Sequence, residues 1–169
     1  MNLAVIDVLD EQIGVLELYL TRTAKVDDVQ TYHRLRTIPG VGPVLALVLL
    51  YEIHDIARFG SEGQFLSYAR LVRCGHESAG KMLGSGGKKI GNAHLRWAFA
   101  EAAYLFLRSS ERAKKWKKRQ LKKRSEGRVL AILAARLARA VYHLWRKGEA
   151  FDEARFWQGQ ATGVAVPSV

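Results

Sequence analysis

The apolar positions of the chain recur at helical intervals. Near its start they alternate at spacings of three and four, which places them on one seam of a helix and is typical of a coiled coil. The seam consists of Ile6, Leu9, Ile13, Leu16 and Leu20. The same spacing also fits a single amphipathic helix packed on its own domain, and the run is too short to choose between the two. We expect a coiled-coil helix over residues 1–28.

A second segment, residues 31–53, predicts two helices joined by a tight turn. Pro39, Gly40 and Gly42 make the turn, and Pro43 suits the first turn of the next helix. This pattern is typical of a helix-hairpin-helix, in which glycines let the backbone approach a phosphate and the free amides of the second helix face the anion. An ordinary helical hairpin with a buried second helix fits as well, and the two interpretations are compatible.

Three more helices follow from the same periodicity. Ser61 suits the N-cap of a helix over residues 62–71, and Asn92 suits the N-cap of a helix over residues 93–109. The latter is apolar nearly all round, Trp97 included, and is therefore expected in the centre of the core. A last helix over residues 128–147 has an inner apolar stripe beside a basic one.

Residues 73–92, between the two capped helices, hold six glycines and little apolar content. They predict a long loop with room for a short β-hairpin within residues 71–90, and loops this long are usually functional. Phe151, Phe156 and Trp157 are expected to anchor the end of the chain, and residues 158–169 to form a flexible tail. We therefore predict a mostly α-helical domain over residues 29–157, with the helix-hairpin-helix and the glycine-rich loop, preceded by the coiled-coil helix.

Composition narrows the class of protein. The 169 residues are 49% apolar, which suits a packed core and excludes full disorder. The single cysteine, Cys74, excludes a disulfide scaffold and a cysteine-rich zinc module. The longest apolar run, residues 44–51, is far shorter than the roughly 20 residues that span a membrane. The start of the chain has no basic signal-peptide pattern. We expect a cytoplasmic protein without a membrane partner.

Basic residues are concentrated in two regions of this chain, whose net charge is +11. Residues 108–124 carry ten bases against Glu111 alone, and a second cluster lies within residues 70–96. Such clusters favour a polyanion partner, although a solvated helix face is the simpler alternative for each. The candidate nucleic-acid-binding residues are Gly40, Gly42, Arg73, Lys81, Lys88, Lys89, Arg96, Lys114, Lys115, Lys117, Lys118, Lys122 and Lys123.

Few residues are placed to carry out chemistry. No carboxylate cluster or histidine spacing indicates a metal site, and Cys74 near His76 is better explained as a small buried apolar group. Ser78 is the sharper candidate nucleophile, because the cations around it in sequence suit the charge that develops when a phosphodiester is attacked. Ser85 has almost the same claim from the residues alone.

The run ARLVRCGHESAGKMLGSGGKKIGNAHLRWAFAEAAYLFL resembles the C-terminal transposase domain of the "one-ten" family of bacterial insertion-sequence transposases, recombinases guided by a bridge RNA. The hairpin TIPGVGPVLALVLLYEI and the closing helix LAARLARAVYHLWRKGEAFDEARFW look like the family's as well. The resemblance covers roughly residues 5–157. Each piece alone is common, whereas the combination is specific.

The resemblance implies that Ser78, in HESAGK, is the nucleophile that becomes joined to a DNA strand end, and that Ser85 does not match. It implies DNA and structured bridge RNA as partners, and a homo-oligomer formed through the coiled-coil connector of residues 1–28. Family members also carry an N-terminal acidic domain with bound divalent metal, which has no counterpart here. We therefore expect no cofactor in this chain, and activity only together with that domain. The alternative is a non-catalytic helix-hairpin-helix module that binds nucleic acid.

Overall fold

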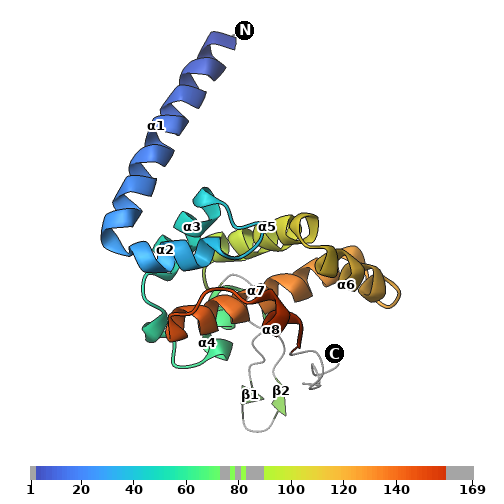
Figure 1. The fold of residues 1–169 in the computed structure, drawn as a ribbon. Helices are drawn as coiled ribbons and strands as arrows, with labels where there is room; N and C mark the ends of the chain where they lie inside the picture. The colour runs from blue at the N-terminus through green and yellow to red at the C-terminus, as the bar shows by residue number, and fades with distance from the viewer. Residues whose placement is uncertain (1–2, 73–76, 79–80, 83–89, 159–169) are drawn as a thin grey trace.

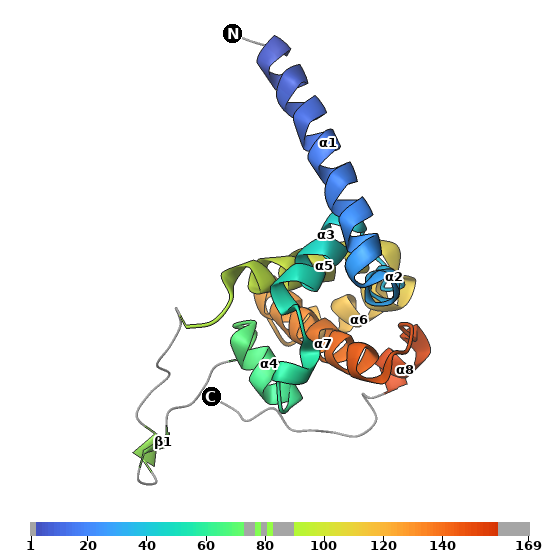
Figure 2. The same ribbon diagram turned by 90° about the vertical axis from the view of Figure 1, so that its left-hand side faces the viewer.

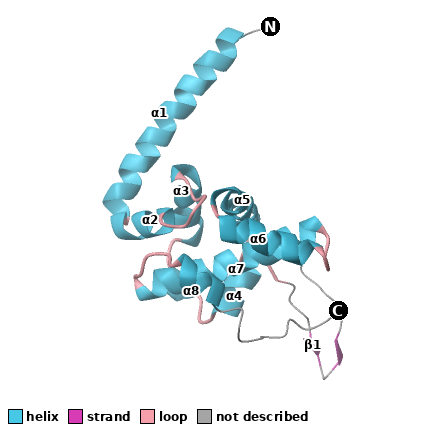
Figure 3. Cartoon of the chain, turned by 45° about the vertical axis from the view of Figure 1, so that its right-hand side comes forward, coloured by secondary structure: helices cyan, strands magenta, loops and turns pink. Residues whose placement is uncertain are grey.

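The computed structural model describes residues 3–72, 77–78, 81–82 and 90–158, and within them the chain is mostly helical (Figures 1 and 3). This confirms the predicted fold class at the level of secondary structure. The helices are α1 (Leu3–Asp27), α2 (Val29–Arg36), α3 (Pro43–Ile53), the short 3-10 helix η1 (Ile56–Arg58), α4 (Glu62–Tyr68), α5 (Ala93–Ser109), α6 (Glu111–Leu121), α7 (Glu126–Lys147) and α8 (Glu153–Gln158). Among these described helices, none combines the length and apolar character needed to cross a membrane.

A two-residue antiparallel ladder interrupts this helical pattern. Strand β1 (Glu77–Ser78) pairs with β2 (Lys81–Met82), and the register sets Ser78 opposite Lys81. The ladder falls within the segment for which the sequence allowed a short hairpin.

Helix α1 extends away from the rest of the chain (Figures 1 and 2). It touches α2 and α3, while the five seam residues from Ile6 to Leu20 are 43–59% exposed. The alternative that this seam packs on its own domain is therefore wrong for the five seam residues. The helix instead presents an apolar surface outward.

The core forms around α5 and α7, which pack against each other while α3 and α4 cover their flanks. Four large residues from three of these helices are almost wholly buried, namely Phe65, Phe99, Leu133 and Leu137. The expected inner stripe of α7 is buried from Leu133 to Leu144. The strong amphipathic period of that helix explains why its orientation followed from sequence.

Helix α5 differs from the expectation that it is buried on all sides. Its inner face holds Phe99 and Phe106, both fully buried, yet Trp97 is 53% exposed and Tyr104 is 52% exposed. An apolar side chain on every face does not require that every face be covered, because the number of neighbours is set by the tertiary structure. Only one side of α5 belongs to the core.

The predicted N-caps are present. The side chain of Ser61 accepts a hydrogen bond from the Gln64 amide at 3.3 Å, and that of Asn92 accepts from the Leu95 amide at 2.9 Å. Helix α4 ends at Tyr68 and not near residue 71, because Arg70 adopts a left-handed conformation with φ 55° that cannot continue a helix.

Candidate nucleic-acid interface

Helix α6 is attached to the domain by a narrow apolar face. Ser110 caps it by accepting from the Ala113 amide at 3.1 Å, and Ala113 and Trp116 are its buried residues. The remaining positions turn outward, so the helix is strongly amphipathic with an almost purely basic outer face. The predicted lysines of this region that are exposed are Lys114, Lys115, Lys118, Lys122 and Lys123, and Lys117 is half-buried.

Two of these lysines are neutralised locally. Lys114 pairs with Glu111 at 2.5 Å, and Lys117 pairs with Glu126 of α7. Each lysine donates a hydrogen bond to its carboxylate and thereby lowers the pKa of that glutamate below its ordinary value. Lys115, like the three lysines that follow at 118, 122 and 123, makes no ion pair within the described ranges. Their charge is available to an external polyanion.

The end of the chain holds α6 in place. Glu153 of α8 accepts a hydrogen bond from the Ser110 hydroxyl and another from Trp157 Nε1 at 3.1 Å. The Trp157 ring lies against Trp116 of α6, with centroids 5.9 Å apart. The cap of α6 and its one large anchor are thus both fixed by the same short helix, so the expected anchoring role of Trp157 is confirmed.

Arg136 of α7 lies between these rings. Its guanidinium stacks over Phe156 at 4.9 Å and Trp157 at 5.2 Å, and it donates to the Phe156 carbonyl at 2.8 Å. Burial lowers its pKa, because removal from water disfavours the charged form. This arginine belongs to the structural support of α8.

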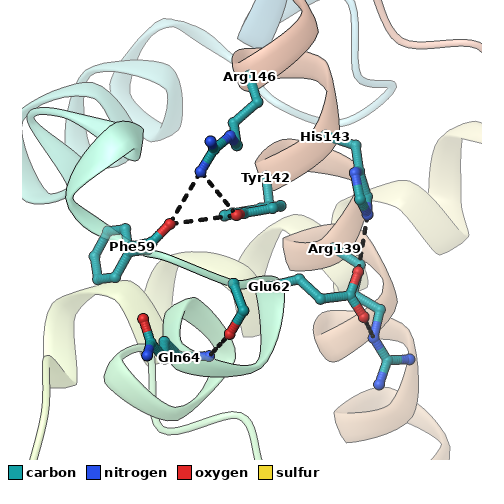
Figure 4. A network of polar contacts seen from close by, with 8 residues as sticks. Phe59, Glu62, Gln64, Arg139, Tyr142, His143 and Arg146 are labelled. Carbon is teal, nitrogen blue, oxygen red and sulfur yellow. Dashed lines mark hydrogen bonds and ion pairs between the residues drawn. The ribbon is translucent and has the colours of Figure 1, made fainter.

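The neighbouring bases of α7 are likewise engaged within the protein (Figure 4). Arg139 and His143 contact the Glu62 carboxylate at 3.3 and 2.8 Å. Arg146 donates to the Phe59 carbonyl at 3.1 Å and to the Tyr142 hydroxyl at 3.1 Å. The basic stripe that the sequence placed on α7 therefore joins α7 to the η1–α4 segment.

The two glycines of the α2–α3 turn have different surroundings. Gly40 has φ +87°, and a Cβ there would lie 2.7 Å from backbone atoms of Leu105 and Phe106, so the turn needs glycine to rest against α5. Gly42 has an extended conformation and open space where a Cβ would stand. It precedes Pro43 at the start of α3, whose cap has no side-chain hydrogen bond. Close approach from outside is therefore open only at Gly42.

The glycine-rich loop is only partly described. The backbone of Ser78 and of Lys81 belongs to the two-residue ladder, whereas Arg73, Lys88 and Lys89 lie outside the described residues, as do the alternatives Cys74, His76 and Ser85. Arg96 is exposed on α5. Within the described ranges no three potential metal ligands gather at one place.

Two residues of the interface region were missed from sequence. Trp97 was assigned to the core and Tyr104 was not singled out, yet both side chains are exposed on the outer face of α5. The signal that distinguishes them is their spacing of seven, followed by Arg108 four residues later, which places an arginine on the same stripe as the two rings.

Known proteins resemble this chain over the same elements. The family model described as transposase, IS116/IS110/IS902 family, matches residues 32–119, from α2 almost to the end of α6. The transposase of insertion sequence IS1111A from Coxiella burnetii is 30% identical over 146 residues, which covers 84% of this chain and 40% of that protein. A putative transposase of Sinorhizobium fredii, y4pF/y4sB, is 30% identical over 89% of this chain and 39% of its own length.

The transposase of insertion sequence IS1328 from Yersinia enterocolitica is 29% identical over 86% of this chain and 44% of its own length. The chain thus spans about two fifths of the length of these relatives. The family model covers more than half of the chain, including the glycine turn, the serine-containing loop and most of the basic helix. On this ground the chain belongs to the IS116/IS110/IS902 family of transposases.

Proposed function

We propose that this chain is the C-terminal, serine-bearing part of its transposase, and that it binds DNA and structured RNA through the outer face of α6. The observation that carries the proposal is a set of exposed lysines without ion pairs in the described ranges. Lys115 and Lys118 lie on α6 within the family match, and Lys122 and Lys123 follow directly after the helix. Phosphates neutralised by such lysines release condensed counterions, which makes binding fall with salt.

Binding by α6 is tested with a duplex and the full chain at several salt concentrations. Replacement of Lys118 by Gln removes one exposed cation. The plot of log affinity against log salt concentration has a negative slope, and its magnitude should decrease by about one. The matched control is Lys147→Gln, which removes one exposed cation at the far end of α7. Equal slopes for the wild type and both variants would refute binding through α6.

For the chemistry we propose Ser78 as the nucleophile. Its hydroxyl oxygen forms a bond to the phosphorus of a DNA strand while the bond from phosphorus to the leaving strand oxygen breaks. The serine proton passes to a base, and the leaving oxygen takes up a proton, so the strand end stays joined to the protein. The family resemblance and the cations near Ser78 in sequence support this role.

Covalent joining is measured as a protein–DNA species that survives denaturing electrophoresis. The full chain is combined with the acidic domain of a relative, because the family resemblance places the metal site there. We expect Ser78→Ala to abolish the species while DNA binding persists, and Ser85→Ala to retain it. A covalent species formed by Ser78→Ala would refute the assignment.

A non-catalytic binding module is the second candidate, and the open start of α3 at Gly42 favours it. In this case the free backbone amides beyond Pro43 would donate hydrogen bonds to a phosphate. Variants of Ser78 would then change neither DNA binding nor the yield of a covalent protein–DNA species. For both candidates we propose that α1 mediates homo-oligomerisation, because its exposed apolar seam has no cover within the described residues.

A further inference from the structure

The outer face of α5 carries two large aromatic rings that are about half exposed. Trp97 is 53% exposed and Tyr104 is 52% exposed, and neither ring stacks on another ring or on a cation within the described part of the chain. Each exposed ring of this size leaves a large apolar area in water, which is unfavourable unless a partner covers it. Both rings are therefore available for stacking on an external partner.

The two rings share one stripe of the helix. A separation of seven residues corresponds to two helical turns, or about 10 Å along the axis, which is close to the length of roughly three nucleotides stacked at about 3.4 Å each. Ala100 and Glu101, both half-buried, lie between the rings. The small side chain of Ala100 leaves room for flat groups to lie across the helix.

Charge beside the two rings favours nucleic acid over protein. Arg96 and Arg108 are exposed and make no ion pair within the described ranges, and Arg112 follows at the start of α6. Glu101 is the acid between the rings, and it disfavours a phosphate at the centre while leaving both ends free for one. Trp, Tyr and Arg are also enriched at protein interfaces, and it is the net charge of +11 that favours a polyanion as the partner.

We propose that Trp97 and Tyr104 form a stacking platform for unpaired nucleobases, with Arg96 and Arg108 receiving the flanking phosphates. The platform deepens the proposed nucleic-acid binding and rests on it, since α6 supplies the attraction to the polyanion. It predicts that the chain binds a single strand through contacts that a duplex lacks, because bases in a duplex are already stacked on each other.

The test compares a single strand of about a dozen nucleotides with a duplex of the same sequence. Trp97→Ala and Tyr104→Ala should each weaken single-strand binding about 5- to 100-fold, while duplex binding changes less than about twofold. The matched control is Tyr19→Ala, which removes an exposed ring of α1 and should change neither affinity.

Tryptophan fluorescence gives a second readout. The single strand should quench the emission of the wild type, and Trp97→Phe should lose that quenching yet keep most of the affinity, because the other described tryptophans are buried or half-buried. If Trp97→Ala and Tyr104→Ala weakened single-strand and duplex binding equally, or weakened neither, the stacking platform would be refuted. If these alanine variants changed the oligomeric state but left single-strand binding unchanged, the stripe would be a protein interface and the platform would be refuted. If the wild type bound neither strand, nucleic-acid binding as a whole would be refuted.

Discussion

Asn92 donates a hydrogen bond from its side-chain nitrogen to Glu52 Oε2 at 2.6 Å, across 40 residues of sequence. The same side chain caps α5 through its oxygen, and the Asn92 amide donates to the Tyr68 carbonyl at 2.7 Å. One residue thus fastens the end of the glycine-rich segment to α3, α4 and α5 together. The position at which the chain leaves that segment is consequently fixed.

Replacement of Asn92 by Ala should lower the free energy of unfolding by about 1–2 kcal/mol, because the cap and the bond to Glu52 are both lost. Asn92→Asp keeps a capping oxygen but sets a carboxylate against Glu52. The double variant Asn92→Asp with Glu52→Gln removes this repulsion, and its free energy of unfolding should lie between those of the wild type and of Asn92→Ala. Urea unfolding measures these values. An Ala variant as stable as the wild type would contradict the role of Asn92.

The two glycines of the α2–α3 turn should respond in opposite ways. Gly40→Ala should destabilise the domain by about 2 kcal/mol or more, because a left-handed φ and a backbone clash with α5 both oppose a Cβ. Gly42→Ala should leave the unfolding midpoint unchanged, since its Cβ meets open space.

The same pair distinguishes a structural from a binding role of the turn. If a phosphate approaches the start of α3, Gly42→Ala should weaken DNA binding although the fold is intact. Unchanged DNA affinity in Gly42→Ala would exclude that contact and leave Gly40 with a packing role alone.

The apolar seam of α1 predicts self-association. Leu9→Lys together with Leu16→Lys places charges on the seam and should shift the chain toward a monomer in analytical ultracentrifugation. The matched control, Glu11→Lys with Glu17→Lys, makes a larger change in charge off the seam and should leave the assembly intact. If the seam variant sedimented like the wild type, self-association through α1 would be refuted.

Helix α8 should control the position of α6. Trp157→Ala removes the ring that covers Trp116 and Phe106 and should cost about 2 kcal/mol of stability, because the ring is half-buried. The emission of Trp116 should shift to the red as water reaches it. Trp97→Ala is the control, since it removes an exposed ring of α5 and should leave the Trp116 environment unchanged.

The ion pairs of α6 should stabilise the fold less as the pH falls. Hydrogen bonds from Lys114 and Lys117 lower the pKa of Glu111 and Glu126 in the folded state. The unfolded chain therefore binds more protons as pH falls below the ordinary glutamate value. The stabilisation is present above that value and is lost as pH falls through the lowered pKa.

Glu126→Gln tests this pH dependence. The variant should be slightly less stable than the wild type near neutral pH and equal to it in acid, as followed by urea midpoints. The difference should be small and should shrink with added salt, because both carboxylates are exposed. A difference that is the same at every pH would contradict the assignment.

The periodicity of the sequence determined most of the secondary structure. The caps at Ser61 and Asn92, the Pro43 start of α3 and the inner stripe of α7 are local patterns, and each is read from neighbouring residues. The charge of α6 is equally a property of its own residues. These features were therefore predictable without knowledge of any long-range contact.

Tertiary structure decided which of the candidate residues remain available to a partner. Arg139 and Arg146 look like free cations in sequence, yet Glu62 and the Phe59 carbonyl engage them from a distant segment. Trp97 looks like core, yet its side chain is 53% exposed on α5. Availability depends on what the rest of the chain places against a side chain, and a spacing along one helix carries no information about that.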